Sequence, residues 1–121
     1  MKDSIKISPP NSMLFISDRD TGVVPEIARG RRIWATSSCI VFGCLMFMDG
    51  ETEVTLGNTS DVGIADKAAF EGMLESPSRM VVVSTVGWKP ILSSAVATRI
   101  TPVRIWTNHP TEPDKVIIGL G

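Results

Sequence analysis

Short apolar segments separated by turn-forming residues run along the whole chain, and this pattern is what most constrains its fold. The longest segment, residues 40–48, has about the length of one buried strand, whereas a membrane-spanning helix needs about 20 such residues. We therefore expect no membrane partner. Many short strands with frequent turns are typical of sandwiches and barrels. We expect an all-β fold in one domain, residues 1–121: an antiparallel β-sandwich or partly open barrel of about eight short strands.

The individual strands follow from the apolar segments between the turns. We expect strands at residues 5–8, 13–17, 31–37, 40–48, 51–56, 79–85, 102–107 and 115–120. Residues 91–97 fit either a strand or one turn of helix. Residues 66–75 fit a short helix, or a strand with Phe70, Gly72 and Leu74 on one face, and we favour the strand. The expected core residues of the last two strands are Val103, Ile105, Val116, Ile118 and Leu120.

Asp49 and Gly50 stand between two strand-like segments, residues 40–48 and 51–56. An Asp-Gly pair in this position favours a type I′ hairpin turn, and the turn fixes which side chains share a face. The expected core face of the first strand carries Val41, Gly43, Leu45 and Phe47. Its other face carries Phe42, Cys44, Met46 and Met48. Because that second face is also apolar, another element or a partner must cover it, and we expect a symmetric homodimer through these four side chains.

Two cysteines bear on the redox environment. Cys39 and Cys44 lie in one expected strand, where an extended chain separates them by about 16 Å. A disulfide cannot span this distance, so we expect both thiols to be reduced and buried. Residues 1–10 lack the apolar stretch of a secretory signal. Both observations predict a cytoplasmic protein.

Charge is nearly balanced, with 12 Lys and Arg against 13 Asp and Glu and a formal net charge of −1. Nucleic-acid binding draws much of its affinity from a basic surface that neutralises phosphates. The basic cluster of this chain is Arg29, Arg31 and Arg32, which we interpret as a solvated approach to a strand. The sequence thus argues against a nucleic-acid partner, although it leaves room for a small anionic ligand.

Residues that carry catalysis or bind metals are sparse. His109 is the single histidine, and together with the two cysteines it does not have the spacing of a zinc site. Residues 18–22 begin like a calcium loop, but Arg29 stands where the closing carboxylate would be, so we expect an Asx-type turn there. The sequence does not support a catalytic Cys39–His109 pair. We expect no catalytic residue, no metal site and no cofactor.

Arginine and tryptophan recur together on two expected strands. Arg32 and Trp34 share one strand face. Arg104 and Trp106 share a face of another strand. Both residue types are enriched at binding hot spots, so we predict that these four side chains lie together on one sheet face and form a binding site with His109. The alternative is that each Trp belongs to the core and each Arg covers its rim.

The end of the chain, Val103-Arg104-Ile105-Trp106 followed by a loop and Val116-Ile117-Ile118, resembles the ends of small bacterial competence-type nuclease inhibitors. The resemblance covers the last two expected strands and holds no diagnostic motif, so no functional residue is carried over from it.

From the residues themselves we expect a non-enzymatic protein-binding module, a regulator or inhibitor of a bacterial partner protein. The alternative is a small enzyme or small-ligand carrier with its pocket near the loop of residues 108–114. A third interpretation is an oligomeric structural protein. A deep pocket containing His109 and carboxylates would favour the enzyme, whereas a flat surface of Trp and Arg would favour the binding module.

Overall fold

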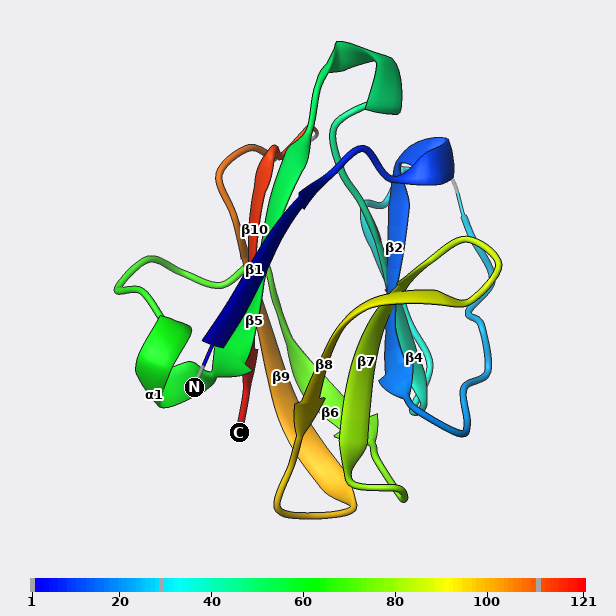
Figure 1. Ribbon diagram of the computed structural model, residues 1–121, viewed down its shortest axis with the longest axis vertical. Coiled ribbons are helices and arrows are strands. Elements are labelled where there is room, and N and C mark those ends of the chain that lie inside the picture. The colour runs from blue at the N-terminus through cyan, green and yellow to red at the C-terminus, as the bar shows by residue number, and fades with distance from the viewer. Residues whose placement is uncertain (1, 29, 111) are drawn as a thin grey trace.

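Two β-sheets packed face to face make up the fold (Figure 1). The computed structural model describes residues 2–28, 30–110 and 112–121, apart from the side chain of Phe47. The first sheet consists, in spatial order, of β1 (Lys2–Ile7), β5 (Thr52–Asn58), β10 (Lys115–Leu120), β9 (Ile100–Thr107) and β6 (Phe70–Glu75). The second consists of β3 (Ile33–Ala35), β4 (Cys39–Gly43), β2 (Met13–Asp18), β7 (Met80–Thr85) and β8 (Lys89–Ala95). A short helix, α1 (Thr59–Val62), packs on β5 and β10 outside the first sheet (Figure 1).

The predicted β-sandwich is confirmed. The described residues form ten strands where about eight were expected, in two five-stranded sheets that do not close into a barrel. Neighbouring strands are antiparallel, with the exception of β5 and β10, which run parallel. Among the described residues, no helix has the length and apolar character required to cross a membrane.

Two ambiguous segments are resolved as strands. Residues 70–75 form β6, as favoured, and residues 89–95 form β8. The alternative of a short helix over residues 66–75 is wrong, because no helix forms there; α1, at Thr59–Val62, was not predicted. Strand β3 covers residues 33–35, whereas residues 31–37 were expected. Its three residues are those that pair with β4.

The predicted hairpin at Asp49 and Gly50 is wrong. Strand β4 ends at Gly43 and pairs with β2 and β3 in the second sheet, whereas β5 belongs to the first. Residues 44–51 cross from one sheet to the other and include a 3-10 turn, Phe47–Asp49. A type I′ turn requires positive φ at both central residues. Gly50 has a φ of 138°, but Asp49 is not among the described residues with positive φ.

Long-range contacts explain why the chain leaves the ladder here. The Cys44 amide donates to the Ser12 carbonyl at 2.9 Å, and the Leu45 amide donates to the Pro113 carbonyl at 2.9 Å. Both acceptors are distant in sequence, so long-range pairing, and not the local preference of the Asp-Gly pair, sets the path of this segment. The side chain of Phe47 lies outside what the structure describes.

The predicted division of faces in this segment is also reversed. Ile40, Phe42 and Cys44 belong to the core between the sheets. Val41 is fully buried on the other side of β4. That outer side is covered by the segment between β2 and β3, which is held by the Thr36 hydroxyl donating to the Val23 carbonyl at 2.6 Å. Strand β4 is therefore apolar on both faces because both faces are covered within the chain.

The homodimer face expected from Phe42, Cys44, Met46 and Met48 does not form. Phe42 is 1% and Cys44 5% exposed, because both fill the core. Met46 and Met48 lie on the exposed crossing between the sheets, at 45% and 72% exposure. The four side chains thus share no surface through which two copies could pair.

The last two strands agree with the prediction. Strands β9 and β10 pair antiparallel, with Val103 opposite Leu120 and Ile105 opposite Ile118. These side chains and Val116 lie in the core. Alternation along a strand places every second residue on the same face, and here both strands follow it without a break.

Two smaller predictions concern Asp18 and the cysteines. Asp18 accepts a hydrogen bond from the Asp20 amide at 2.9 Å, which is the expected Asx-type turn. Cys39 and Cys44 are free and buried, as expected. Burial raises the pKa of each thiol to about 11, so both are protonated and unreactive at neutral pH.

Candidate binding cleft

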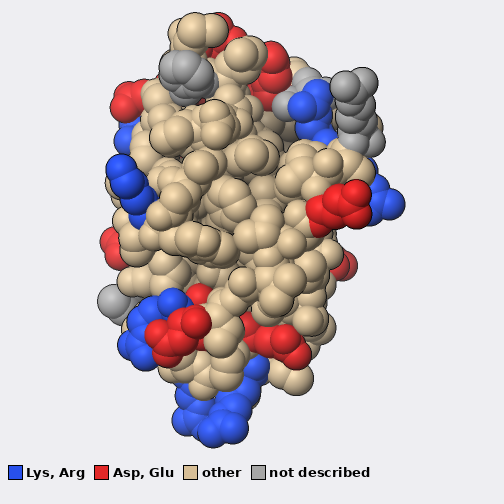
Figure 2. Space-filling model, turned by 90° about the vertical axis from the view of Figure 1, so that its right-hand side faces the viewer, with Lys and Arg blue, Asp and Glu red and all other residues tan. Residues whose placement is uncertain are grey.

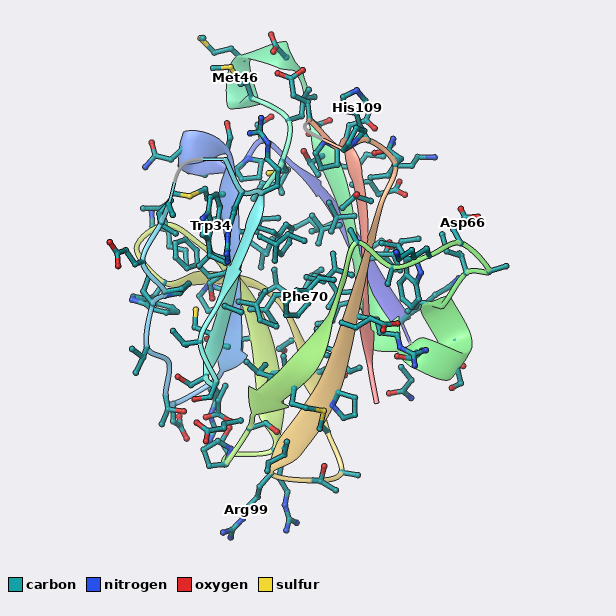
Figure 3. All side chains as sticks on the ribbon, turned by 180° about the vertical axis from the view of Figure 1, so that it is seen from behind. Trp34, Met46, Asp66, Phe70, Arg99 and His109 are labelled. Atoms are coloured by element: carbon teal, nitrogen blue, oxygen red, sulfur yellow. The ribbon has the colours of Figure 1, made fainter. Side chains whose placement is uncertain are left out.

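A cleft of about 460 Å³ opens between the two sheets, at the end of the sandwich that holds the loop after β9. In Figure 3, the labelled Phe70 lies between the two sheets and His109 lies at the upper end of the sandwich. Phe70, the first residue of β6, lies on one side of the cleft with Thr107 at the end of β9, and the start of β3 with the end of β4 forms the other side. Its principal lining residues are Arg31, Arg32, Phe42, Phe70, His109 and Pro113.

The cleft exists because the edges of the sheets meet at one end and separate at the other. The Glu75 amide at the end of β6 donates to the Ser37 carbonyl at 2.8 Å. The Ser37 hydroxyl also donates to Glu75 Oε1 at 3.2 Å. These bonds join β6 to the turn between β3 and β4. At its other end, β6 begins at Phe70, and the space between the sheets is open.

The loop 108–114 is braced before it reaches the cleft. Asn108 Oδ1 accepts from the amides of Asp114 and Lys115 at 3.2 and 3.1 Å. The Glu112 amide donates to His109 Nδ1 at 2.9 Å. Because Nδ1 accepts this bond, the proton of the neutral imidazole resides on Nε2. The Pro113 carbonyl accepts from the Leu45 amide, which fixes the loop to the segment after β4.

Positive charge at the cleft has no acidic counterpart. Arg31 and Arg32 are exposed, and the described lining contains no carboxylate. The ion pairs found among the described residues, Arg19–Asp20 and Arg104–Glu71, do not involve these two guanidinium groups. Phe42, Ile33 and Phe70 provide an apolar wall beside them. The arrangement suits a ligand that has a carboxylate or another anion next to an apolar group.

The described lining of the cleft offers two side chains with polar groups beside its arginines. Thr107 supplies a hydroxyl and His109 an imidazole, but no lining carboxylate or thiol stands beside them. Cys39 is buried in β4 and is not part of the lining, so the Cys39–His109 pair does not form. Nucleophilic catalysis needs a nucleophile within hydrogen-bonding reach of a base. The described cleft residues do not make that arrangement.

The residues predicted for binding divide among three places. Arg32 and His109 come together at the cleft. Trp34 is half-buried in the second sheet, with its Nε1 donating to the Ala28 carbonyl at 2.9 Å. Arg104 lies on the first sheet, where its Nε is 3.4 Å from Glu71 Oε1. The prediction that Arg32, Trp34, Arg104 and Trp106 share one sheet face is wrong, because β3 and β9 belong to different sheets.

Trp106 is a packing residue of the outer layer. It is 5% exposed, and its Nε1 donates to the Asp66 carbonyl at 2.9 Å. The ring lies over Gly119, where a Cβ would come within 3.0 Å of it and within 2.7 Å of the Thr59 hydroxyl. Glycine at that position therefore lets Trp106 and α1 approach the sheet. This is the core interpretation of the tryptophan that the sequence left open.

Sequence reasoning missed Arg31, Phe42, Phe70 and Pro113 as cleft residues. Arg31 was visible in the basic cluster, but nothing in the cluster itself shows that it borders an apolar opening. Phe70 lies in the segment that fitted both helix and strand. Phe42 was assigned to the wrong face of its strand. The exposed position of Arg31 and Arg32 just before β3 does agree with the solvated approach predicted for that segment.

A second surface lies on the outside of the second sheet. Figure 2 shows that face as a broad uncharged area with charged residues mainly at its rim. Val23, Ile27 and Trp88 are exposed on the loops that border it, at 66%, 45% and 48%. The Trp88 ring packs against Phe15 with centroids 5.6 Å apart. This face also has a smaller hollow of about 320 Å³, lined by Ser17, Ser84 and Trp88 among others. We regard the larger cleft between the sheets as the candidate site because it brings together Arg32 and His109, two of the residues predicted to bind.

The fold belongs to the class of two-sheet β-sandwiches, and solved structures share it. No protein-family model matches the chain, and its sequence matches no curated protein. One similar structure is ComJ, inhibitor of the DNA degrading activity of NucA, from Bacillus subtilis, with a TM-score of 0.56 and 12% identity over 98% of this chain and 93% of that one. Another is described as Crocagin biosynthetic gene J, with a TM-score of 0.50 and 12% identity over 98% and 94% of the two chains.

At 12% identity these similarities show the fold alone. The similarity to ComJ extends over nearly the whole chain, whereas the resemblance in sequence rested on the last two strands.

Proposed function

We propose that this protein is a binding module that inhibits or regulates a partner protein, and that the cleft is where the partner docks. The observation that carries the proposal is the cleft itself, in which two exposed arginines without an acidic counterpart border an apolar wall. Arginine is enriched at binding hot spots because its planar group makes several directed hydrogen bonds. Arg32 and His109 therefore keep the binding role expected of them, and Arg31 joins them.

The fold gives this proposal a direction. ComJ, which has the same fold, is an inhibitor of a DNA-degrading enzyme. Fold similarity at this identity is an analogy and does not transfer a partner. It makes a bacterial nuclease the first class of partner to examine. We also propose that the protein works in the cytoplasm, since Cys39 and Cys44 are both free thiols and the cytoplasm keeps thiols reduced.

Capture from the native cell extract tests the proposal. The immobilised wild-type protein, Arg32→Glu and Arg99→Glu are compared. Arg99 is exposed at the opposite end of the sandwich (Figure 3), so its reversal matches the charge change without touching the cleft. The captured protein is identified by mass spectrometry, and its activity, DNA degradation first, is measured while each variant is titrated in.

The proposal predicts a stoichiometric complex with the wild type and Arg99→Glu, in which the partner's activity falls as either is added. Arg32→Glu is expected to capture and inhibit at least about tenfold less well, which corresponds to about 1.4 kcal/mol. If no stoichiometric partner is captured, or if the captured partner keeps its full activity at saturation, the proposed function is wrong.

A small-ligand carrier is the second candidate, and the size of the cleft favours it. Its volume of about 460 Å³ is within the range of about 300–1,000 Å³ typical of small-molecule sites. A carrier would retain an apolar anion. Native mass spectrometry of protein purified from its own cells separates the two cases, because a carrier shows a mass increment that Arg32→Glu loses, whereas the module shows the mass of the chain alone.

A further inference from the structure

Strand β6 is an edge strand, and the hydrogen-bonding pattern shows which of its backbone groups are free. It closes the first sheet and pairs with β9 alone. Just after β6, the Ser76 amide donates to the Arg99 carbonyl at 2.7 Å. This bond identifies Ser76 as a residue whose backbone groups point toward β9, and so determines the direction of every other residue in the strand. In an antiparallel pair, backbone groups point alternately toward the partner and away from it. Those of Phe70, Gly72 and Leu74 therefore face β9, and those of Glu71, Met73 and Glu75 face the free edge.

This edge is occupied at one end and open at the other. The outward Glu75 amide donates to the Ser37 carbonyl. Within residues 2–28, 30–110 and 112–121, no hydrogen bond reaches the outward amides of Glu71 and Met73. The open part of the edge leads directly into the cleft, because Phe70 belongs to both.

The β6 edge is less protected against pairing than edge strand β8, because it contains neither lysine nor proline, although it has two glutamates. Natural edge strands are protected by lysine, proline or charged side chains. Edge strand β8 begins with Lys89 and Pro90. In β6, Met73 is 56% exposed, and the two carboxylates are held in place, Glu71 by Arg104 and Glu75 by Ser37. A segment approaching this edge meets unpaired amides and an apolar wall.

We propose that the partner supplies an extended acidic segment, which adds to the first sheet as a strand beside β6 and sets a carboxylate against Arg31 and Arg32. This inference rests on the proposed function and specifies what the cleft recognises. The free edge from Phe70 to Leu74 accommodates about five residues at about 3.3 Å each. Backbone hydrogen bonds give affinity in such strand addition, and side-chain pockets give specificity. The uncompensated guanidinium groups select acidic residues at the end of the strand.

Short peptides of valine and threonine test the inference without knowledge of the partner. Two probes carry a pair of glutamates, one at the amino end and the other at the carboxyl end, so that either strand direction is covered. Lysine versions are their controls. A third version of each probe is N-methylated at alternate residues, which removes the amides needed for a ladder. Binding is followed by NMR of the ¹⁵N-labelled protein, in which the amide signals of Glu71 and Met73 are diagnostic.

Two pairs of variants divide the backbone contribution from the charge contribution. Met73→Pro removes an outward amide of β6. Ser93→Pro is its control and removes an outward amide of edge strand β8. The Val96 amide donates to the Arg79 carbonyl, so the amide of Val96 points toward β7 and that of Ser93, three residues earlier, points away from it. Arg32→Glu reverses a charge at the cleft, and Arg99→Glu reverses one far from it. Far-UV circular dichroism and the melting temperature establish that each variant is folded before it is used.

At least one glutamate probe is expected to bind the wild type, Ser93→Pro and Arg99→Glu alike, and to shift and protect the amides of Glu71 and Met73. Met73→Pro and Arg32→Glu are each expected to weaken it at least about tenfold, as are N-methylation and the lysine replacement. The inference is overturned if neither glutamate probe binds, if the lysine probes bind equally well, or if Met73→Pro binds as tightly as Ser93→Pro. If the peptide experiment fails in one of these ways but the protein still captures and inhibits a partner, the proposed function is supported and strand addition at β6 is excluded.

Discussion

Trp106→Ala separates a packing role of this tryptophan from the binding role that the sequence suggested. The ring is 5% exposed and lies between the first sheet and α1. Its indole N–H is bonded to the carbonyl of Asp66, an exposed residue, so water can take over that hydrogen bond once the ring is gone. The cost of the substitution is therefore mainly the lost burial of the ring and the cavity that remains over Gly119.

Truncation of a buried Trp to Ala costs about 3–5 kcal/mol. Whole domains are stable by about 5–15 kcal/mol, so this is a large part of the total. In a chain of 121 residues, each kcal/mol lowers the melting temperature by about 4 °C, so a decrease of about 12–20 °C is expected. Loss of α1 packing accompanies it, because the helix rests on the same ring.

Urea unfolding followed by far-UV circular dichroism measures the effect without relying on the fluorophore that is removed. Trp88→Ala is the matched control, since that ring is 48% exposed, and we expect it to cost about 1 kcal/mol or less. A Trp106→Ala protein as stable as Trp88→Ala, yet unable to bind the partner, would refute the packing argument and restore Trp106 as a binding residue.

Three further predictions test the fold. Burial would raise the pKa of Asp18, but hydrogen bonds from the Ser78 hydroxyl and nearby amides outweigh it and lower the pKa. A carboxylate with a lowered folded-state pKa stabilises above its unfolded-state pKa, and this contribution is lost as the pH falls through the folded-state value. Asp18→Asn should cost about 2 kcal/mol in urea unfolding at neutral pH and less below about pH 4, and a difference independent of pH would contradict this. Cys39 and Cys44 should resist iodoacetamide in the native protein and react without reductant once it is unfolded, whereas protection that persists in urea would indicate a disulfide. Gly50→Val should lose about 1–3 kcal/mol, because φ is 138° at that residue, and an unchanged melting temperature would exclude strain there.

Local patterns predicted the parts of the fold whose pairing is local. Strands β9 and β10 are joined by one loop, and the alternation of Val103 and Ile105 with Arg104 and Trp106 is sufficient to assign their faces. Segment 80–85 contains three consecutive valines and forms β7 as expected. In these cases the information that decides the structure lies within the strand or its immediate neighbour.

The hairpin error has a definite physical cause. The segment 40–48 is apolar without a period, so its sequence cannot show which face is inward, and the Asp-Gly pair was the remaining guide. Pairing of β4 with β2 places Phe42 opposite Leu14 and turns that side chain into the core. The pairing of β4 with β2, which are far apart in the sequence, thus determined which side chains of β4 face the core. In an isolated hairpin, the turn would determine this.

The candidate site depended even more on contacts that the sequence does not display. Arg32 and His109 were both predicted to bind, but for different reasons and beside different neighbours. They meet because β3 and β6 lie at the same side of their respective sheets, with β6 facing β2 and β4. The hydrogen bonds between Ser37 and Glu75 close one end of that side, so the opening lies at the other. Strand order and a single cross-sheet contact therefore created the cleft.

The distribution of charge, rather than its total, gives the cleft its selectivity. A net charge of −1 argues against a nucleic-acid partner and says little else. Within the cleft, however, Arg31 and Arg32 border an apolar wall with no carboxylate among the described lining residues. A carboxylate brought there by a partner would gain two charge-assisted contacts, and β6 would supply backbone bonds beside it. A basic segment of the same length would meet the same backbone but would be repelled by Arg31 and Arg32, while Glu71 and Glu75 of β6 are already engaged by Arg104 and Ser37. The proposed mode of recognition therefore predicts that acidic extended segments bind in preference to basic ones, although the protein as a whole is almost neutral.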